Sequence, residues 1–403
     1  MNLRKRSLLA LVATLVFVAM VAAGCGGGTS TTSSTGTSGE TVEVKIGIGA
    51  PLTAGAVALG EGMQRGAELA IEQANASDAA KKAGIKFVGV PGDDQGDPTK
   101  GGNVANTFAS DPALVGVMGH LNSGVSIPAS KIYNRAKIVQ VSPASTNPQL
   151  TLQGLNNIFR VCTIDSVQGP AGADYAYKDL GLKTAYVIDD STPYGEGLAA
   201  EFAKQFAADG GKVLGTAKTS DKDTDFNALV TKMKGLNPEV VYYGGIYNSG
   251  ALLAKQWSEA GGKAPIMGGD GMYDPTYIKL AGAANAEGDY CTSVGLPLDQ
   301  LPKGGDFKTA FEKKFPGKDI AAYDAYAFDA TQVIIDAVIK AAETSGADKV
   351  TSTTGRDEII KNVAATNTEG VTGAISFDTN GDTTNKAITL YVVKNGAWVP
   401  WTK

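Results

Sequence analysis

From residue 42 onward, hydrophobic and polar positions follow two alternating periods. Short runs rich in β-branched and other apolar residues predict strands at residues 44–50, 86–90, 114–119 and 138–142. Between these runs, apolar residues recur at the spacing of a helical face, which predicts helices at residues 61–75, 99–110 and 125–134. Strands that alternate with helices are typical of βαβ units, so we expect a parallel sheet covered by helices on both faces.

A second series repeats this order. It predicts strands at 184–189, 212–217, 240–244 and 265–268, and helices at 197–208, 226–236 and 251–260.

Short sequences recur at matching points of the two series. Leu59-Gly60-Glu61-Gly62 follows the first strand of one series, and Tyr194-Gly195-Glu196-Gly197 follows the first strand of the other. After the third strands stand Asn122-Ser123-Gly124 and Asn248-Ser249-Gly250. Chance matches in a chain with 51 glycines are the alternative explanation. The shared order favours an α/β fold with two similar doubly wound parallel-sheet lobes.

The amino terminus has the pattern of a targeting segment. A basic stretch at residues 4–6 precedes an apolar run at 8–23, which is shorter than the ~20 residues of a membrane-spanning helix. We therefore predict a signal peptide at residues 1–24. The small residues before Cys25 resemble a bacterial lipobox, whose cysteine becomes lipidated; an ordinary signal peptide beside an unrelated cysteine is the alternative.

Residues 25–41 are almost entirely Gly, Ser and Thr, which predicts a flexible tether behind a lipidated Cys25. The protein is then expected on the extracytoplasmic face of the cell membrane, in the periplasm or on the outer surface.

Composition excludes several classes of function. The net charge of −5 does not favour nucleic-acid binding. His120 is the single histidine, which excludes a multi-histidine metal site, and three cysteines exclude a Cys₄ zinc site. Asp378-Thr379-Asn380-Gly381-Asp382 begins like a calcium loop but lacks its later glycine and glutamate, so Asn380-Gly381 is interpreted as a hairpin turn between residues 375–377 and 388–393. We expect no metal, no cofactor and no enzymatic activity, with His120 as a packed residue.

Small polar residues follow strands in both series. Ser123 and Ser145-Thr146 follow neighbouring strands of the first series, where hydroxyl and backbone N–H groups suit a carboxylate. Asp270 follows a strand of the second series, where a lone acid suits an ammonium. Together these groups describe a site for an α-amino acid in a cleft between the lobes. The alternative is that Ser123, Thr146 and Asp270 only cap helices.

Several stretches, in order, make the chain resemble a known family. They are Asp93-Asp94 with Asp97-Pro98, Gly119-His120-Leu121, Pro128-Ala129-Ser130, Phe159-Arg160, Asp165-Ser166, Gln168-Gly169-Pro170, Tyr194-Gly195-Glu196-Gly197, Val241-Tyr242-Tyr243-Gly244-Gly245 and Ala286-Glu287-Gly288. Across residues 42–403 the chain resembles the bacterial branched-chain amino acid-binding proteins, which have the type I periplasmic-binding-protein (Venus-flytrap) fold and serve ABC importers.

The resemblance implies a domain organisation and partners. Lobe 1 would comprise residues 42–161 and 292–386, and lobe 2 residues 162–291 and 387–403, joined by a three-stranded hinge. The protein would capture an amino acid and deliver it to an ABC permease in the membrane, and we expect a monomer.

The resemblance also implies ligand contacts. The family's carboxylate- and ammonium-binding positions fall on Ser123, Ala144 and Thr146, and an acidic position, usually glutamate, falls on Asp270. A covering tyrosine falls on Tyr194. The family's other cleft aromatics fall on Leu59 and near Ile246, with Tyr247 beside it, so the side-chain pocket differs and leucine, isoleucine or valine cannot be assumed. The neighbouring Asn122 and Ser145 complete the expected ligand contacts.

By the same resemblance the chain crosses between the lobes near residues 160–163, 290–293 and 387–390. Cys162 and Cys291 lie on the first two crossings. Adjacent hinge strands would bring the two thiols together, so we predict a disulfide between them; two buried free thiols are the alternative.

Other functions stay open on the sequence. The same fold binds other small solutes, such as an amide, urea, a polar amino acid or an aromatic acid, and a ligand-sensing lipoprotein would share these features. A secreted hydrolase is disfavoured because the chain has one histidine and no nucleophile elbow.

Overall fold

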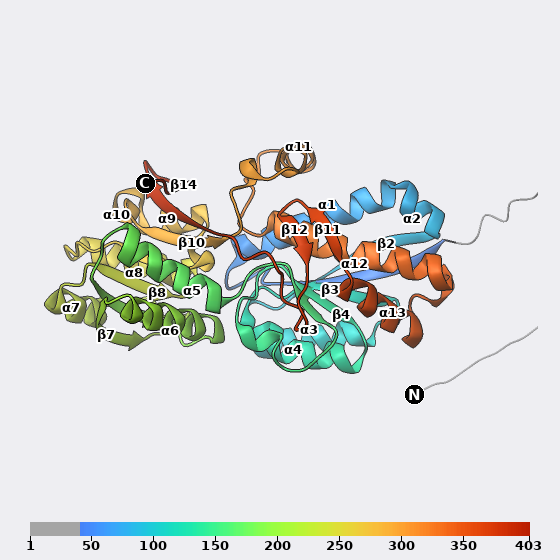
Figure 1. Ribbon diagram of the computed structural model, residues 1–403, viewed down its shortest axis with the longest axis horizontal. Coiled ribbons are helices and arrows are strands. Elements are labelled where there is room, and N and C mark those ends of the chain that lie inside the picture. Colours follow the sequence, from blue (N-terminus) through green and yellow to red (C-terminus); the bar gives the residue numbers. More distant parts are fainter. Residues whose placement is uncertain (1–40) are drawn as a thin grey trace, which may run out of the picture. The chain divides into compact units, whose positions relative to one another are not determined.

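The computed structural model describes residues 41–403 (Figure 1). The predicted signal peptide, Cys25 and all but the last residue of the predicted tether lie outside these residues. The described part of the chain forms two large sheets, each with its own helices, and a two-stranded sheet. We call the five-stranded sheet and the helices around it lobe 1, and the seven-stranded sheet and its helices lobe 2.

Lobe 1 is built on a parallel sheet with the strand order β2-β1-β3-β4-β5. Its strands are β1 (Val42–Ala50), β2 (Ile85–Asp93), β3 (Leu114–Gly119), β4 (Val139–Ser142) and β5 (Ile158–Arg160). Its helices are α1 (Val57–Ala76), α2 (Asp78–Ala83), α3 (Pro98–Ser110), α4 (Ser123–Arg135), α11 (Gly304–Lys314), α12 (Asp324–Ser345) and α13 (Thr353–Ala364). The two-stranded sheet of β11 (Asn367–Gly370) and β12 (Gly373–Ser376) joins this lobe, because Asp329 of α12 accepts hydrogen bonds from the backbone at Val371 and Thr372.

Lobe 2 has the order β14-β13-β10-β9-β8-β6-β7. Its parallel strands are β6 (Thr184–Asp189), β7 (Lys212–Lys218), β8 (Val240–Gly244), β9 (Ile266–Gly268) and β10 (Tyr290–Val294); β13 (Ile388–Lys394) and β14 (Ala397–Pro400) are antiparallel additions at one edge. Its helices are α5 (Asp165–Asp174), α6 (Pro193–Ala208), α7 (Asn227–Leu236), α8 (Tyr247–Glu259), α9 (Pro275–Ala281) and α10 (Ala283–Ala286).

The two lobes share one topology, as predicted. In each, the first strand lies between the second and third, and the fourth and fifth follow in sequence. The repeated glycines have the same task in both lobes. A Cβ on Gly60 would lie 2.0 Å from the carbonyl oxygen of Pro51, and one on Gly195 would lie 2.4 Å from that of Gly244. Only glycine lets these helices start so close to a neighbouring backbone.

The predicted elements of both series are confirmed with small shifts at their ends. Asn380-Gly381 forms a tight turn that Phe377 and Thr383 close with an antiparallel bridge, but the strands predicted on either side of it do not pair with each other. β12 pairs with β11, and β13 pairs with β10 and β14, so the segments on either side of Asn380-Gly381 belong to different sheets. Only a local turn remains, in which the backbone N–H of Asp378 donates to the carbonyl of Asp382.

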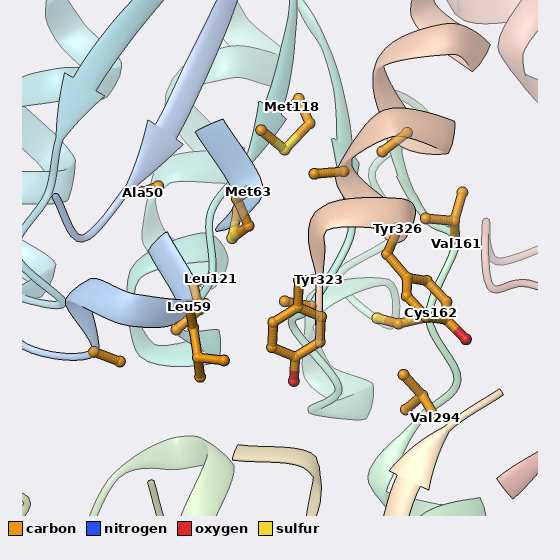
Figure 2. Packing of buried hydrophobic residues seen from close by; sticks show 14 of the residues in the cluster. Ala50, Leu59, Met63, Met118, Leu121, Val161, Cys162, Val294, Tyr323 and Tyr326 are labelled. Atoms are coloured by element: carbon orange, nitrogen blue, oxygen red, sulfur yellow. The ribbon is translucent and has the colours of Figure 1, made fainter. Parts of the chain in front are cut away.

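The predicted disulfide is also wrong: Cys162 and Cys291 are buried free thiols. The assumption of adjacent hinge strands fails. Cys162 follows β5, whose last residue Arg160 pairs with Asp382, whereas Cys291 lies within β10 between β9 and β13. The Cys162 thiol faces the carbonyl of Ser145 at 3.7 Å, and Figure 2 shows it beside Tyr326 of α12.

The topology passes the chain between the sheets after β5, after β10 and again before β13. The exact lobe boundaries given above stay a proposal, and β10 pairs inside the lobe 2 sheet up to Val294.

The hydrophobic core of lobe 1 extends to the end of its sheet that faces lobe 2. α12 packs along α1 and over β3 and β4. At its start, Tyr323 is buried against Leu59 and Leu121, which Figure 2 shows on one side of its ring. The hydroxyl of Tyr323 points out of this cluster toward lobe 2. Among the helices of residues 41–403, none combines the length and the hydropathy needed to span a bilayer.

We expect both thiols to be free in the purified protein. Denaturation without a reducing agent should let iodoacetamide alkylate Cys162 and Cys291 together, because no disulfide protects them. In the folded protein both should react slowly, because both side chains are fully buried and burial raises the pKa of each thiol. Peptide mapping by mass spectrometry checks this, and recovery of a Cys162–Cys291 cross-linked peptide would contradict it.

Candidate functional site

The loops at the carboxyl ends of the strands enclose a small chamber between the lobes. Its volume is about 20 Å³. Its wall is formed by Leu59, Leu121, Asn122, Ser123, Ala144, Tyr194, Ile246, Gly271 and Tyr323. Asn122, Ser123, Tyr194 and Ile246 also line a cleft of about 560 Å³, so the chamber is the inner end of that cleft. The chamber holds about one water, so a larger ligand enters it only when the lobes move apart.

Ser123 lies in the wall as the first residue of α4. Its hydroxyl does not cap the helix. It accepts a hydrogen bond from the backbone N–H of Asn147 at 3.2 Å, and its own proton stays available to a ligand. With the unpaired N–H groups at the start of this thirteen-residue helix, Ser123 forms a donor set for an anion.

The loop after β4 supplies the second edge of this donor set. Ala144 lies in the wall, whereas the Ser145 hydroxyl contacts the carbonyl of Leu121 at 2.9 Å and ties the two loops together. Thr146 is fully buried behind the wall, and its hydroxyl oxygen has no hydrogen-bond partner within residues 41–403. The Thr146 hydroxyl faces the Asp165 carboxyl and works against the rise in that carboxyl's pKa, so Thr146 reaches a ligand only if it turns away from Asp165.

Asp270 is the acidic group of the site, and its carboxylate is fully buried. Tyr194 of lobe 2 donates to one oxygen at 2.9 Å, and Tyr323 of lobe 1 donates to the other at 2.6 Å. Burial raises the pKa of Asp270, and the hydrogen bonds from the two tyrosines oppose that rise. The carboxylate thus lies directly behind the Tyr194 and Tyr323 side chains of the wall and joins the two lobes.

A second acid, Asp165, lies close to these groups at the start of α5. It is fully buried, and both of its carboxylate oxygens lack a hydrogen-bond partner in the described part of the chain. Burial raises its pKa to about 8. The Oε1 atom of Gln168, one turn further along α5, is also unpartnered. With Asp165 protonated, its second oxygen and the Oε1 atom of Gln168 remain as acceptors for an N–H group.

The remaining predicted residues fall into two groups. Leu59 and Ile246 lie in the chamber wall, and Asn122 lies in the wall with an unpartnered Oδ1. Tyr247 does not reach the chamber: its hydroxyl accepts from the backbone N–H of Ala58 at 3.1 Å and connects the lobes.

Two further hydrogen bonds connect the lobes near the cleft. Asn248 donates to the carbonyl of Gly55 at 3.0 Å, and Asn147 donates to that of Pro193 at 2.6 Å. Together with the contact of Tyr247, these hydrogen bonds hold the two lobes against each other around the cleft.

The helix-capping alternative is wrong for all three candidate residues. Asn122, not Ser123, occupies the cap position of α4, Thr146 caps no helix, and the Asp270 carboxylate bonds to side chains of two tyrosines. His120 is packed as expected, with its ring nitrogens 2.6 Å from Asp94 and 2.8 Å from the hydroxyl of Tyr133.

Sequence reasoning missed Tyr323, Leu121 and Gly271 of the wall, and Asp165 behind it. Tyr323 and Asp270 are far apart in the sequence, and no local pattern links them. The sequence did contain a signal for Asp165: it follows β5 after a short loop and begins α5, and Ser123 was predicted from the same kind of position between a strand and a helix.

Comparisons with known proteins find similarity over most of the described residues. Residues 43–397 match the family model described as periplasmic binding protein. The chain is 35% identical over 357 residues to Leu/Ile/Val-binding protein homolog 1 of Brucella suis biovar 1 (strain 1330), which covers 88% of this chain and 91% of the relative.

Two solved structures are similar in fold. A leucine binding protein, LivK, of Thermotoga maritima MSB8 aligns with a TM-score of 0.80 and 30% identity over 89% of this chain and 98% of its own. The branched-chain amino acid transporter substrate binding protein LivJ of Streptococcus pneumoniae, solved in complex with isoleucine, aligns with a TM-score of 0.77 and 25% identity over 89% of this chain and all of its own (100%).

Asp165 should make stability depend on pH. Its carboxyl loses its proton near pH 4 in the unfolded chain and near pH 8 in the folded protein, so the folded protein binds more protons between these values. The free energy of unfolding therefore falls as pH rises through this window, by up to about 1.4 kcal/mol per pH unit from this group. Asp165→Asn should remove that contribution.

Urea unfolding of wild type and Asp165→Asn at pH 5, 6, 7 and 8 measures the effect. The exposed Asp348→Asn is a matched control and should follow wild type. Parallel pH profiles for wild type and Asp165→Asn would contradict a buried, neutral Asp165.

Proposed function

We propose, on the premise that this chain belongs to the periplasmic binding protein family, that it captures a branched-chain amino acid between its two lobes. It is a binding protein and not an enzyme, with an α/β fold of two parallel-sheet lobes. Under this proposal the loaded protein delivers the amino acid to an ABC permease in the membrane.

One observation supports the amino-acid assignment most strongly. Ser123, at the start of α4, lies in the chamber wall with donors for a carboxylate, and the acidic Asp270 lies behind Tyr194 and Tyr323 of the same wall, one from each lobe. A small ligand with a carboxylate and an ammonium would satisfy both the donors at Ser123 and the acid at Asp270. Within a closed, low-dielectric chamber these interactions are stronger than in water.

The wall between the two polar ends favours an aliphatic side chain. Leu59, Leu121, Ala144 and Ile246 present apolar surface, and they include two positions where the resembled family carries aromatic residues. The names of the relatives, Leu/Ile/Val-binding protein homologues and leucine binding protein, support the same class of ligand.

Closure would couple binding to transport. A ligand that contacts Ser123 in lobe 1 and the acidic group in lobe 2 binds the closed form more tightly than the open one, so it shifts the population toward closure. The interlobe hydrogen bonds at Tyr247, Asn248 and Asn147 form only when the lobes are together. The closed surface is then what a permease would recognise.

We further propose that the protein is anchored through Cys25. This residue follows the predicted signal peptide, and a lipid on it would leave the Gly/Ser/Thr segment as a tether to residue 41.

A ligand panel tests the proposed function. Leucine, isoleucine and valine should raise the melting temperature more than the other amino acids, urea, short amides and benzoate. At a concentration 100 times its Kd, a ligand should add about 2.7 kcal/mol to the free energy of unfolding. Stabilisation by an amide or an aromatic acid, with none by the branched-chain amino acids, would overturn the assignment.

Two variants assign the ends of the ligand. Asp270→Asn should weaken the binding of leucine and leucinamide by at least about tenfold and leave the binding of 4-methylpentanoate, which has no amine, unchanged. Ser123→Ala should weaken the binding of leucine and 4-methylpentanoate and leave that of leucinamide, which has no carboxylate, unchanged. Calorimetry gives the Kd values. Ser130→Ala is the matched control. Ser130 is a buried serine further along α4 and outside the chamber wall, and its hydroxyl donates to the carbonyl of Ile127 and accepts from Gln153.

The anchor predicts a change of location. In a bacterial host, the wild-type protein should fractionate with membranes and incorporate labelled fatty acid. Cys25→Ser should be released into the soluble extracytoplasmic fraction, whereas Ser34→Ala should behave as wild type. A Cys25→Ser protein that still carries label and pellets with membranes would argue against the lipobox.

A further inference from the structure

A buried arginine lies beneath the carboxylate-binding loops, away from the chamber. Arg160 ends β5 and is fully buried, and it is the largest side chain with less than 2% exposure in the described residues. A buried guanidinium is stable only when its N–H groups find acceptors. It is absent from the chamber wall, so it does not touch a ligand there.

The guanidinium makes four hydrogen bonds. Its Nη1 donates to the carbonyl oxygens of Ser145 at 2.7 Å and Asn147 at 2.9 Å, and its Nη2 donates to the hydroxyl of Thr151 at 2.7 Å. Its Nε donates to Asp382 at 2.6 Å, and Thr151 donates to the same carboxylate oxygen at 2.9 Å. Arginine, with its planar fork of donors, can hold these acceptors at once, and lysine cannot.

The two carbonyls lie on either side of Thr146. Holding both of them fixes the peptide groups on either side of Thr146 and so the place from which its side chain leaves the backbone. The same loop carries the backbone N–H of Asn147, which donates to the hydroxyl of Ser123. Arg160 therefore sets the positions of both hydroxyls that the proposed carboxylate site uses.

The oppositely charged partner of Arg160, Asp382, comes from a distant part of the chain. Asp382 follows β12 and precedes the return of the chain to lobe 2 as β13. The backbone N–H of Arg160 also donates to the carbonyl of Gly381 at 3.0 Å. The first and last connections between the lobes are thereby joined at one buried ion pair, directly below the binding loop.

We infer that Arg160, paired with Asp382, is a positioning residue that orients the Ser123 and Thr146 hydroxyls toward the ligand carboxylate. The inference rests on the proposed function, because it assumes an amino-acid carboxylate at these hydroxyls. Arg160 should therefore contribute to the tighter binding of leucine than of leucinamide, which has the same side chain and amine but no carboxylate.

The test is the ratio of the two Kd values, measured by calorimetry on folded protein. Wild type should prefer leucine by at least about tenfold. Arg160→Lys keeps a cation near Asp382 but loses the fork, and should reduce the preference by about tenfold. Thr151→Val removes one acceptor of the guanidinium and leaves the ion pair, and should reduce it by about threefold. If Arg160→Lys fails to fold, Thr151→Val decides the matter.

Thr331→Val is the matched control. Thr331 is also a fully buried threonine of lobe 1, and its hydroxyl bonds to a carbonyl within α12. This variant should keep the wild-type ratio.

The possible outcomes are distinguishable. If Arg160→Lys and Thr151→Val weaken the binding of leucine and of leucinamide by the same factor, or lower only the melting temperature, Arg160 has only a structural role. That result overturns the inference and leaves the proposed function standing. If wild type binds leucine and leucinamide equally, the carboxylate site itself is overturned, and the inference with it.

Discussion

A carboxylate removed from water must be given hydrogen-bond donors, and at Asp270 those donors come from both lobes. Tyr194 lies in the same lobe as the acid, but Tyr323 belongs to the other lobe and bonds to the second oxygen. If the lobes separate, Asp270 loses one of its two donors. The acid is thus a contact between the lobes, and under the proposed function it is also the group that binds the ligand's ammonium.

Much of the fold was predictable because its signals are local. A parallel sheet requires strands of a few apolar residues followed by amphipathic helices, and both series show this period directly in the sequence. The repeated glycines marked equivalent points because a close backbone approach at Gly60 and Gly195 tolerates no side chain. The C-terminal third was harder, since β13 pairs with β10 and not with the neighbouring β12, and no local pattern determines the partner of a strand.

The site was predictable where residues follow strands directly and unpredictable where contacts are long-range. Ser123, Ala144 and Asp270 were found from strand ends and from the family resemblance. Tyr323 and Arg160 act through partners far away in the sequence. The disulfide prediction failed for a related reason: two cysteines on hinge segments need adjacent strands to meet, and β5 and β10 are not neighbours in either sheet. Burial and proximity are properties of the tertiary fold, which the sequence does not display residue by residue.

The late arrival of β13 and β14 has a consequence for how the protein is made. Without these last strands, β10 would present a row of open backbone N–H and C=O groups at the edge of its sheet, a template for pairing with other chains. β13 and β14 are synthesised after β10, so the growing chain carries this unpaired strand edge until they emerge from the ribosome. A ribosome that stalls near the end of the message would release an aggregation-prone fragment, even though every residue up to β12 is already in place.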